Sequence, residues 1–195
     1  MHGEPSDPAS DGRFAVVDLE TTGLKAEVDH ILQMAVVHQD ASGRRLGEWS
    51  TYVRPPHRWT TSLGPREIHG ITRRKVVFAP PLADAMRTFV RLTRGHVIVA
   101  HNAAFDLGFL REASTRTEVA LEHSGTLCTL HLARLLGERG QSSNKLSALC
   151  DEFGVDPGRA HDALDDARSA GQVLVHLMNK LGLRTTDELS RHVRS

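Results

Sequence analysis

The chain has 195 residues, enough for one domain of ordinary size with a sizeable hydrophobic core. Its 24 lysines and arginines balance its 24 aspartates and glutamates, so no overall charge indicates a nucleic-acid or membrane partner. The polar N-terminal residues resemble neither a signal peptide nor a membrane-spanning helix, so a cytoplasmic protein without a membrane partner is expected. The two cysteines, Cys128 and Cys150, have no metal-ligand spacing and are expected to be small buried residues.

The first quarter of the chain predicts three strands after a flexible lead-in, residues 1–13, which is rich in Pro, Ser, Asp and Gly. Apolar runs bounded by turn signals place the strands at residues 14–20, 30–39 and 48–55, with a turn at 40–44. Because the connections are short, the three strands are expected to form an antiparallel meander.

Helical patterns dominate the rest of the chain. Residues 55–80 are expected to hold short helical turns at most, and an amphipathic helix follows over residues 81–94. A continuous apolar strand is expected at residues 96–100, with a helix directly after it. Further helices are expected near residues 129–137, 145–154 and 163–181. Strands and helices in this order predict a layered α/β or α+β domain.

Two acidic residues follow the apolar part of the first predicted strand, in the segment VVDLETTG. Asp18 and Glu20 are two positions apart, so in a strand their side chains leave the same face. Two carboxylates at the end of a buried strand repel one another and resist desolvation, and a divalent cation removes that conflict. The D-x-E pair alone is a weak signal, and its place at the end of a core strand is what favours a metal site.

A third acidic residue lies in the segment VAHNAAFD. Asp106 falls in the first turn of the helix that follows the strand at residues 96–100. It could complement the helix dipole or act as a ligand at the carboxyl end of a strand, and the residues alone do not decide between these roles. Asn102 stands where a polar side chain can reach a ligand, and His101 is expected to form a structural hydrogen bond.

The segment AHDALDDAR places His161 close to Asp162, Asp165 and Asp166. Acidic residues are favoured near a helix N-terminus, and Asp162 could cap the helix. Helical geometry alone favours Asp165, four residues after His161, as the neighbour of that histidine. Spacing therefore does not distinguish a solvated helix start from half of a metal site.

Three segments, DLETTGL, HNAAFD and HDALDDA, resemble in order and separation the three motifs of the DEDDh 3′→5′ exonucleases. This family includes the proofreading epsilon subunit of bacterial DNA polymerase III and its stand-alone relatives, and IHGIT, residues 68–72, is similar to a further segment of the epsilon-like branch. The resemblance covers about residues 14–178 and implies an RNase H-like α/β fold, a mixed five-stranded sheet flanked by helices. It predicts an exonuclease domain over residues 14–182 and a short C-terminal helix or tail over 183–195.

The resemblance implies a role for each acidic residue of the motifs and for the histidine. The metal ligands are expected to be Asp18, Glu20, Asp106 and Asp166, and the catalytic set adds the general base, His161. The third motif has the pattern H-x-A-x-x-D, which Asp166 completes and Asp165 does not. Asp162 and Asp165 are then expected to be solvated or capping residues.

Phosphodiester hydrolysis explains why carboxylates and a histidine are needed. Two hard cations about 4 Å apart can bind the attacking and the leaving oxygen, and oxygen ligands suit Mg²⁺ or Mn²⁺, two ions per site. Histidine titrates close to neutral pH and can take the proton from the attacking water. The expected reaction releases nucleoside 5′-monophosphates from a free 3′ end, with single-stranded DNA as the favoured substrate. A 3′→5′ exoribonuclease acting on RNA or short oligoribonucleotides and a non-catalytic nucleic-acid-binding module remain as alternatives.

The resemblance also implies contacts with the terminal nucleotide, which are expected from Thr21, Thr22, Gly23, Leu24, Ile68, His69, Asn102, Phe109 and His161. Gly23 can bring backbone N–H groups near a phosphate or the 3′-hydroxyl group. Leu24 could pack on a base or in the core, and Phe109 is equally suited to stacking on a base and to core packing. The run RRK at residues 73–75 could follow a phosphate backbone or be a solvated charge run.

Two features depart from the family pattern. Family members often have a glutamate and a glycine in the second strand where this chain has Gln33 and Ala35, so a change in packing or pocket shape is expected rather than lost chemistry. No polymerase-binding tail is recognisable after the exonuclease region. This favours a stand-alone nuclease and leaves association with a DNA polymerase open.

Overall fold

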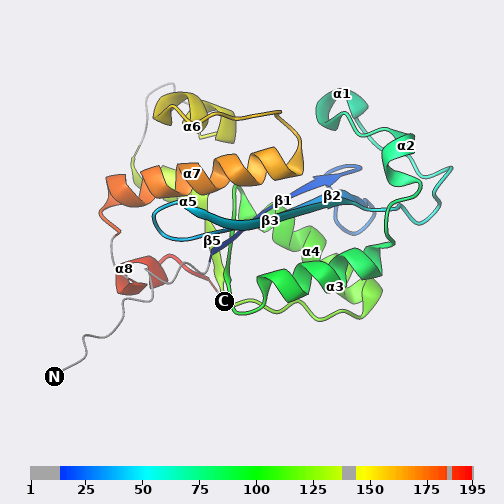
Figure 1. Cartoon of the computed structure of the whole chain (residues 1–195), viewed down its shortest axis with the longest axis horizontal. Helices are drawn as coiled ribbons and strands as arrows, with labels where there is room; N and C mark the ends of the chain where they lie inside the picture. The colour runs from blue at the N-terminus through cyan, green and yellow to red at the C-terminus, as the bar shows by residue number, and fades with distance from the viewer. Residues whose placement is uncertain (1–13, 138–143, 184–185, 195) are drawn as a thin grey trace.

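A five-stranded mixed sheet forms the centre of the computed structural model, which describes residues 14–137, 144–183 and 186–194 (Figure 1). The strands are β1 (Phe14–Thr21), β2 (Ile31–Gln39), β3 (Arg45–Tyr52), β4 (Val97–Ala100) and β5 (Thr126–Cys128). Their spatial order is β3-β2-β1-β4-β5. The first three strands form the expected antiparallel meander, whereas β4 is parallel to β1 and β5 is parallel to β4. The predicted mixed sheet is confirmed, and the expected lead-in, residues 1–13, lies outside the described residues.

Helices cover both faces of the sheet (Figure 1). On one face lie α3 (Leu82–Thr93) and α4 (Ala103–Thr117). On the other face α7 (Ala163–Leu181) packs on β1 and β2, and α5 (Thr129–Leu135) and α6 (Leu146–Phe153) pack against α7. Each face therefore has its own hydrophobic core, with the sheet between them.

Strand β1 lies in the middle of the sheet and is buried on both faces. Phe14 and Val16 belong to the core on the α7 side, whereas Ala15 and Val17 belong to the core under α3 and α4. Side chains alternate along a strand, so the residues at positions 18 and 20 continue the row that faces α7.

Between β3 and α3 the chain forms a small lobe at one end of the molecule. Its two short helices are α1 (Arg66–His69) and α2 (Arg73–Val76), which agrees with the expected short helical turns. Leu63, Ile71 and Val76 pack with Leu32 of β2 in a third apolar cluster. Figure 1 places α1 across from the N-terminal end of α7.

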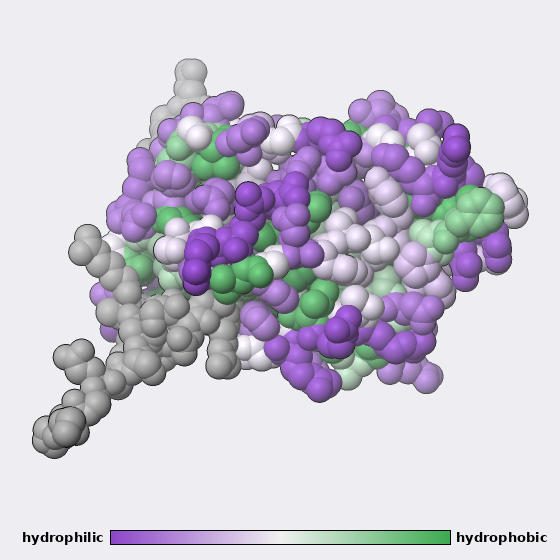
Figure 2. Space-filling view, in the orientation of Figure 1, coloured by the Kyte–Doolittle hydropathy of each residue, from purple (hydrophilic) through white to green (hydrophobic). Residues whose placement is uncertain are grey.

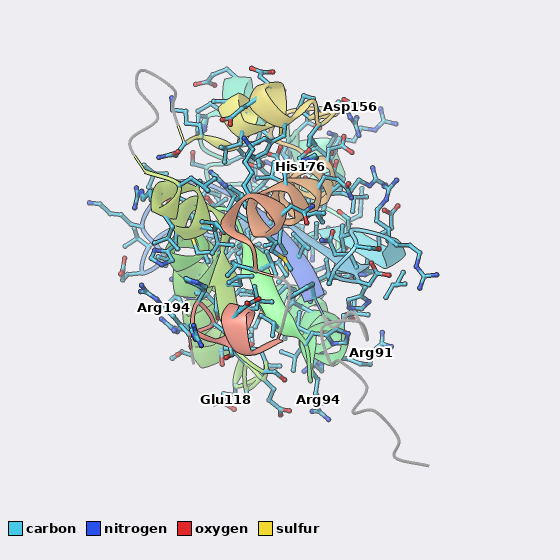
Figure 3. The ribbon with its side chains drawn as sticks, turned by 90° about the vertical axis from the view of Figure 1, so that its left-hand side faces the viewer. Arg91, Arg94, Glu118, Asp156, His176 and Arg194 are labelled. Atoms are coloured by element: carbon cyan, nitrogen blue, oxygen red, sulfur yellow. The ribbon has the colours of Figure 1, made fainter. Side chains whose placement is uncertain are left out.

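The opposite end of the molecule contains the last described residues. Helix α8 (Thr186–Ser190) precedes Arg194, whose backbone N–H donates to the carbonyl oxygen of Thr126 in β5 at 2.8 Å. Figure 3 views this end, with α8 below α7. The sequence pattern did not locate β5, because three residues are too few to show an alternation. Among the described residues, no helix has the length and apolar character needed to cross a membrane.

Replacing Gly64 with alanine is expected to destabilise the protein more than replacing Gly70. Both residues have a positive φ, 71° and 62°, which costs an alanine roughly 1 kcal/mol. A Cβ atom on Gly70 would have no atom within 4 Å, whereas one on Gly64 would overlap the backbone carbonyl of Thr22. Overpacking of this kind adds about 1–3 kcal/mol. Gly64→Ala should therefore have the lower melting temperature in thermal unfolding followed by circular dichroism, and equal melting temperatures would contradict the expectation.

Candidate active site

Asp18 and Glu20 lie at the carboxyl end of β1, on the face that α7 covers. Glu20 is only 9% exposed, and Asp18 is partly buried. In the antiparallel pairing with β2, Asp18 is opposite Ala35 and Glu20 is opposite Gln33. The two departures from the family pattern are therefore the cross-strand neighbours of the two acidic residues. Gln33 is buried and donates its amide to Ser50 Oγ on β3 at 3.2 Å.

Asp106 reaches the same place from the other side of the sheet. It lies in the first turn of α4, is 3% exposed, and accepts a hydrogen bond from the backbone N–H of Leu19 on β1. The helix starts directly after β4, which is parallel to β1, so the carboxyl ends of both strands lie at one edge of the sheet. His101, between β4 and α4, shares a hydrogen bond with Thr129 Oγ1 at 2.9 Å, and burial lowers its pKa to about 4. This agrees with its expected structural role.

The N-terminal end of α7 supplies the third motif. Asp162 caps the helix by accepting from the backbone N–H of Leu164 at 3.2 Å, as expected for a capping residue. His161 precedes the cap with φ of 61°, and its backbone N–H donates to Asp166 Oδ2 at 3.0 Å. The expectation that helical geometry makes Asp165 its neighbour was wrong, because His161 lies outside the helix. Asp165 instead pairs with Arg168 at 2.7 Å.

The predicted acidic residues and the histidine line one cleft of about 380 Å³, with residues of α1 on its opposite side. The four carboxylates come from three segments: Asp18 and Glu20, Asp106, and Asp166. One ligand atom each of Glu20, His161 and Asp166 lies within 4.8 Å of the others.

Burial and mutual repulsion oppose ionisation of these carboxylates. Burial first, then repulsion from Asp106, Asp166 and Glu20, raises the pKa of Asp18 well above its ordinary range. Burial and the charge of Asp166 raise the pKa of Glu20 to about 8, and burial raises the pKa of Asp106 to about 8. Burial also raises the pKa of Asp166, although the N–H of His161 acts in the opposite direction. A cluster of oxygen donors that cannot all be ionised together fits hard divalent cations, which would supply the missing positive charge.

The loop after β1 is held in place by a network that sequence reasoning missed. The carboxylate of Asp29 accepts from Thr22 Oγ1 at 3.0 Å and from the backbone N–H of Lys25 at 2.9 Å. A Cβ atom on Gly23 would lie 2.5 Å from that carboxylate, so a larger residue at this position would displace the Asp29 side chain. Arg116 of α4 donates to the carbonyl oxygens of residues 26, 27 and 29. No local pattern could reveal this anchor, because Arg116 is far from the loop in sequence.

Two exposed apolar side chains stand at the rim of the cleft. Leu24 is 84% exposed and Ile68 is 51% exposed, and both line the cleft. Of the two expectations for Leu24, core packing is therefore wrong. Thr21 is 9% exposed and donates to the carbonyl oxygen of Gly23 at 2.6 Å.

His69 lies in the cleft wall, but both of its ring nitrogens are occupied. Nδ1 accepts from the backbone N–H of Ile71 at 3.0 Å, so Nε2 donates to the carbonyl oxygen of Leu63 at 2.9 Å. The ring holds the lobe together and has no nitrogen left for a substrate. Nearby, Arg73 donates to the carbonyl oxygens of Arg58 and Thr61, so this part of the RRK run is structural.

The prediction that Phe109 stacks on a base was wrong. The ring is 3% exposed and belongs to the core under α3 and α4. Phe105, one helical turn earlier, lies 5.0 Å from it between ring centroids and lines the cleft. Helical periodicity places both rings on one side of α4, and only the packing of the sheet decides which of them is accessible.

Asn102 lies beside the carboxylate cleft rather than in it. It is exposed, has φ of 66°, and lines an adjoining cavity of about 800 Å³. That cavity shares His101, His161 and Asp166 with the cleft and is also lined by Arg134. A contact between Asn102 and a substrate would therefore require the substrate to extend into the second cavity.

A family model described as exonuclease, RNase_T, matches residues 15–174. The chain belongs to this exonuclease family. The recognition from the three motifs is confirmed, and the chain is an exonuclease domain by descent and by fold.

Curated relatives of this exonuclease domain are much longer proteins. A bifunctional exonuclease/endonuclease protein of Mycobacterium tuberculosis is 38% identical over 178 residues, which are 87% of this chain and 27% of that protein. The PolC-type DNA polymerase III of Oceanobacillus iheyensis is 32% identical over 180 residues, 92% of this chain and 12% of the polymerase. The chain thus spans a small part of the relatives that it matches.

Solved exonuclease structures share the fold. Exonuclease X in complex with 5′ overhanging duplex DNA has a TM-score of 0.67 at 25% identity, covering 90% of this chain and 98% of that one. The zinc-bound Escherichia coli exonuclease I–single-stranded DNA complex has a TM-score of 0.77 at 21% identity, covering 92% and 43%. The nuclease domain of 3′hExo, a DEDDh family member bound to rAMP, has a TM-score of 0.74 at 18% identity, covering 93% and 96%. The predicted RNase H-like fold is confirmed.

The raised carboxylate pKa values predict that the metal-free protein loses stability as the pH rises. Glu20 and Asp106 hold their protons to about pH 8 in the folded protein, whereas carboxyl groups of an unfolded chain titrate near pH ~4. Between these values the folded state binds more protons, so the free energy of unfolding decreases with increasing pH. In a chelator, the melting temperature should fall between pH 5 and pH 8, and it should fall less in Glu20→Gln, which cannot ionise there.

Glu27→Gln, at an exposed position, serves as the control and should follow the wild-type curve. Added Mg²⁺ should raise the melting temperature at pH 8 more in the wild-type protein than in Glu20→Gln. An equal fall with pH in all three proteins would contradict the role assigned to the buried carboxylates.

Proposed function

We propose that the chain is a divalent-metal-dependent 3′→5′ exonuclease that hydrolyses DNA and releases nucleoside 5′-monophosphates. The observation that carries the proposal is the convergence of four carboxylates and His161 in one cleft. Membership of the exonuclease family supports the same reaction class. A complete set of acidic residues with a histidine favours an enzyme over a binding module that has lost its chemistry.

The four carboxylates, Asp18, Glu20, Asp106 and Asp166, are the groups proposed to hold two cations, Mg²⁺ or Mn²⁺. When bound, the cations would neutralise the attacked phosphodiester and lower the pKa of water beside it. The chain's own contribution is to hold the carboxylates close together, so that bound cations would relieve their mutual repulsion. The hydrogen bonds from Leu19 to Asp106 and from His161 to Asp166 fix the orientation of two of them.

His161 is proposed to be the general base, which takes the proton from the attacking water on an imidazole nitrogen. Its side chain is exposed, so water and substrate can reach it. Its ring is close enough to Glu20 and Asp166 to share their cleft. The left-handed backbone at this residue lets it stand between the preceding loop and α7 rather than on the helix surface.

The terminal nucleotide is proposed to bind between the loop after β1 and α1. Leu24 and Ile68 offer exposed apolar contact for a base, and Phe105 offers an aromatic ring. The rigid Thr22–Gly23 turn would present backbone groups to the sugar and the 3′-hydroxyl group. Only a strand with a free 3′ end is proposed to be a substrate.

DNA is proposed as the substrate because the relatives covering most of the chain include PolC-type DNA polymerases, and exonuclease X and exonuclease I are bound to DNA. The neighbour 3′hExo is bound to a ribonucleotide, so the preference of this chain for DNA or RNA needs a direct test. In the PolC relatives, the matching region is part of a DNA polymerase. The reaction proposed here does not need an association with a polymerase.

Purified protein should shorten a 5′-labelled single-stranded DNA oligonucleotide one nucleotide at a time in Mg²⁺ or Mn²⁺. The products separated by gel electrophoresis should form a ladder, which should be absent in a chelator, with a blocked 3′ end and in Asp18→Ala. An RNA oligonucleotide of the same sequence should be degraded more slowly. Faster cleavage of the RNA would assign the domain to exoribonucleases, and cleavage from the labelled 5′ end would contradict the proposed polarity.

Asp165 and Asp166 are adjacent in α7, so a matched pair of variants can test which of them is the metal ligand. Asp166→Asn should lower the rate of nucleotide release by at least about 100-fold, because it removes a proposed ligand of the cations that stabilise the transition state. Asp165→Asn should retain most of the activity, because that carboxylate is paired with Arg168 outside the cleft. Melting temperatures of both variants separate lost catalysis from lost folding. The opposite ranking of the two rates would exclude Asp166 as the ligand.

A further inference from the structure

The segment of residues 54–79 differs in charge from the rest of the chain. This segment, called here the basic lobe, contains α1, α2 and the loop that precedes them. It has six lysines and arginines and one acidic residue, Glu67, although the whole chain has no net charge. A local positive surface on a neutral protein is typical of a binding site for a polyanion.

Most of these charges are not neutralised by the protein. In residues 14–137, 144–183 and 186–194, no carboxylate forms an ion pair with the exposed Arg58, Arg66 or Arg74. Elsewhere arginines commonly have acidic partners, as Arg94 has Glu122 at 2.9 Å. The guanidinium groups of these three arginines are therefore available to phosphates.

The basic lobe also exposes two large aromatic side chains. Trp59 is 68% exposed and Phe78 is 83% exposed, and no ring contact within the described residues covers either of them. Figure 2 shows hydrophobic residues among hydrophilic ones at the end of the molecule where Figure 1 places α2. Aromatic rings beside a positive surface are the combination with which proteins bind single-stranded nucleic acids, because every base can stack on them.

The lobe is continuous with the carboxylate cleft. Pro65, which caps the N-terminus of α1, and Ile68 within α1 form part of the cleft wall. The lobe is also internally braced, since Arg73 links the loop at residues 58–61 to α2 and His69 links α1 to Leu63. The segment that contains the exposed arginines and aromatic rings thus also forms part of the wall of the cleft.

We infer that the basic lobe binds the single-stranded polynucleotide on the 5′ side of the terminal nucleotide, with arginines at its phosphates and Trp59 and Phe78 against its bases. This inference rests on the proposed function for the position of the 3′ end in the cleft. It adds a substrate surface outside the catalytic residues. The contacts involve phosphates and base faces, so they should not depend on sequence.

Two substrates distinguish the contribution of the basic lobe from that of the cleft. The p-nitrophenyl ester of thymidine 5′-monophosphate needs only the cleft, whereas a 20-nucleotide single-stranded DNA would also contact the lobe. Arg58→Glu/Arg74→Glu and Trp59→Ala/Phe78→Ala should each lower kcat/KM for the oligonucleotide by about 10-fold or more, mainly through KM, and leave hydrolysis of the ester unchanged. Loss of two phosphate contacts should also reduce the slope of log affinity against log salt by about 1.4.

The control is Arg91→Glu/Arg94→Glu, which reverses two charges at the opposite end of the molecule (Figure 3). It should change neither substrate's kinetics. Oligonucleotide kinetics equal to wild type in both lobe variants, or an equal loss in the control, would overturn the inference.

Direct binding of a fluorescent 20-nucleotide DNA separates the inference from the proposed function. If the wild-type protein hydrolyses neither substrate, the proposed function fails. The anisotropy titration then still tests whether the basic lobe binds DNA. Weaker binding in both lobe variants supports the surface, and unchanged binding overturns it.

Discussion

Four carboxylates in one cleft are the constraint around which this structure is arranged. Each is desolvated by the fold and repelled by the others, which raises the pKa values and makes protons or cations necessary. Asp18 and Glu20 cannot move apart, because β1 is the central strand and is buried on both faces. Asp106 and Asp166 begin helices that pack on opposite faces of the same sheet. The cluster therefore exists only in the folded chain, and cations bound there would stabilise the fold by mass action.

A second set of contacts fixes the loop after β1, which forms the edge of the cleft proposed to face the substrate. The turn at Thr22 and Gly23 packs between the carboxylate of Asp29 and the backbone of Gly64, where a Cβ atom would overlap the carbonyl group of Thr22. Arg116 ties the rest of the loop to α4, the helix that also carries the buried acid of the second motif. The loop that would meet the terminal nucleotide and the carboxylates that would act on it thus share one rigid support. This explains how exposed Leu24 can be held at a defined position without being buried.

Sequence reasoning was successful where a property repeats along the chain or is local. Alternation in β1 placed Asp18 and Glu20 on one face, and the motifs selected the acids that the fold brings together. It was unsuccessful where a single backbone angle, or a contact with residues distant in sequence, determines the position of a side chain. The left-handed conformation of His161 removes it from the helical pattern, and Phe109 is buried by a sheet whose position no helical periodicity reveals. The anchoring of the first loop by Arg116 has no local signal at all.

The charge distribution explains how a neutral chain can act on a polyanion. Without cations, the carboxylates of the cleft offer no positive charge to phosphates, so the cleft alone could not attract a strand. The unpaired arginines of the basic lobe would supply attraction beside the cleft, and cations would bring positive charge into it. Contacts to phosphates and base faces are equivalent at every nucleotide, so a strand shortened by one residue can advance without losing them. A sequence-independent holding surface separate from the hydrolytic cleft would therefore suit the repeated removal of single nucleotides proposed for this domain.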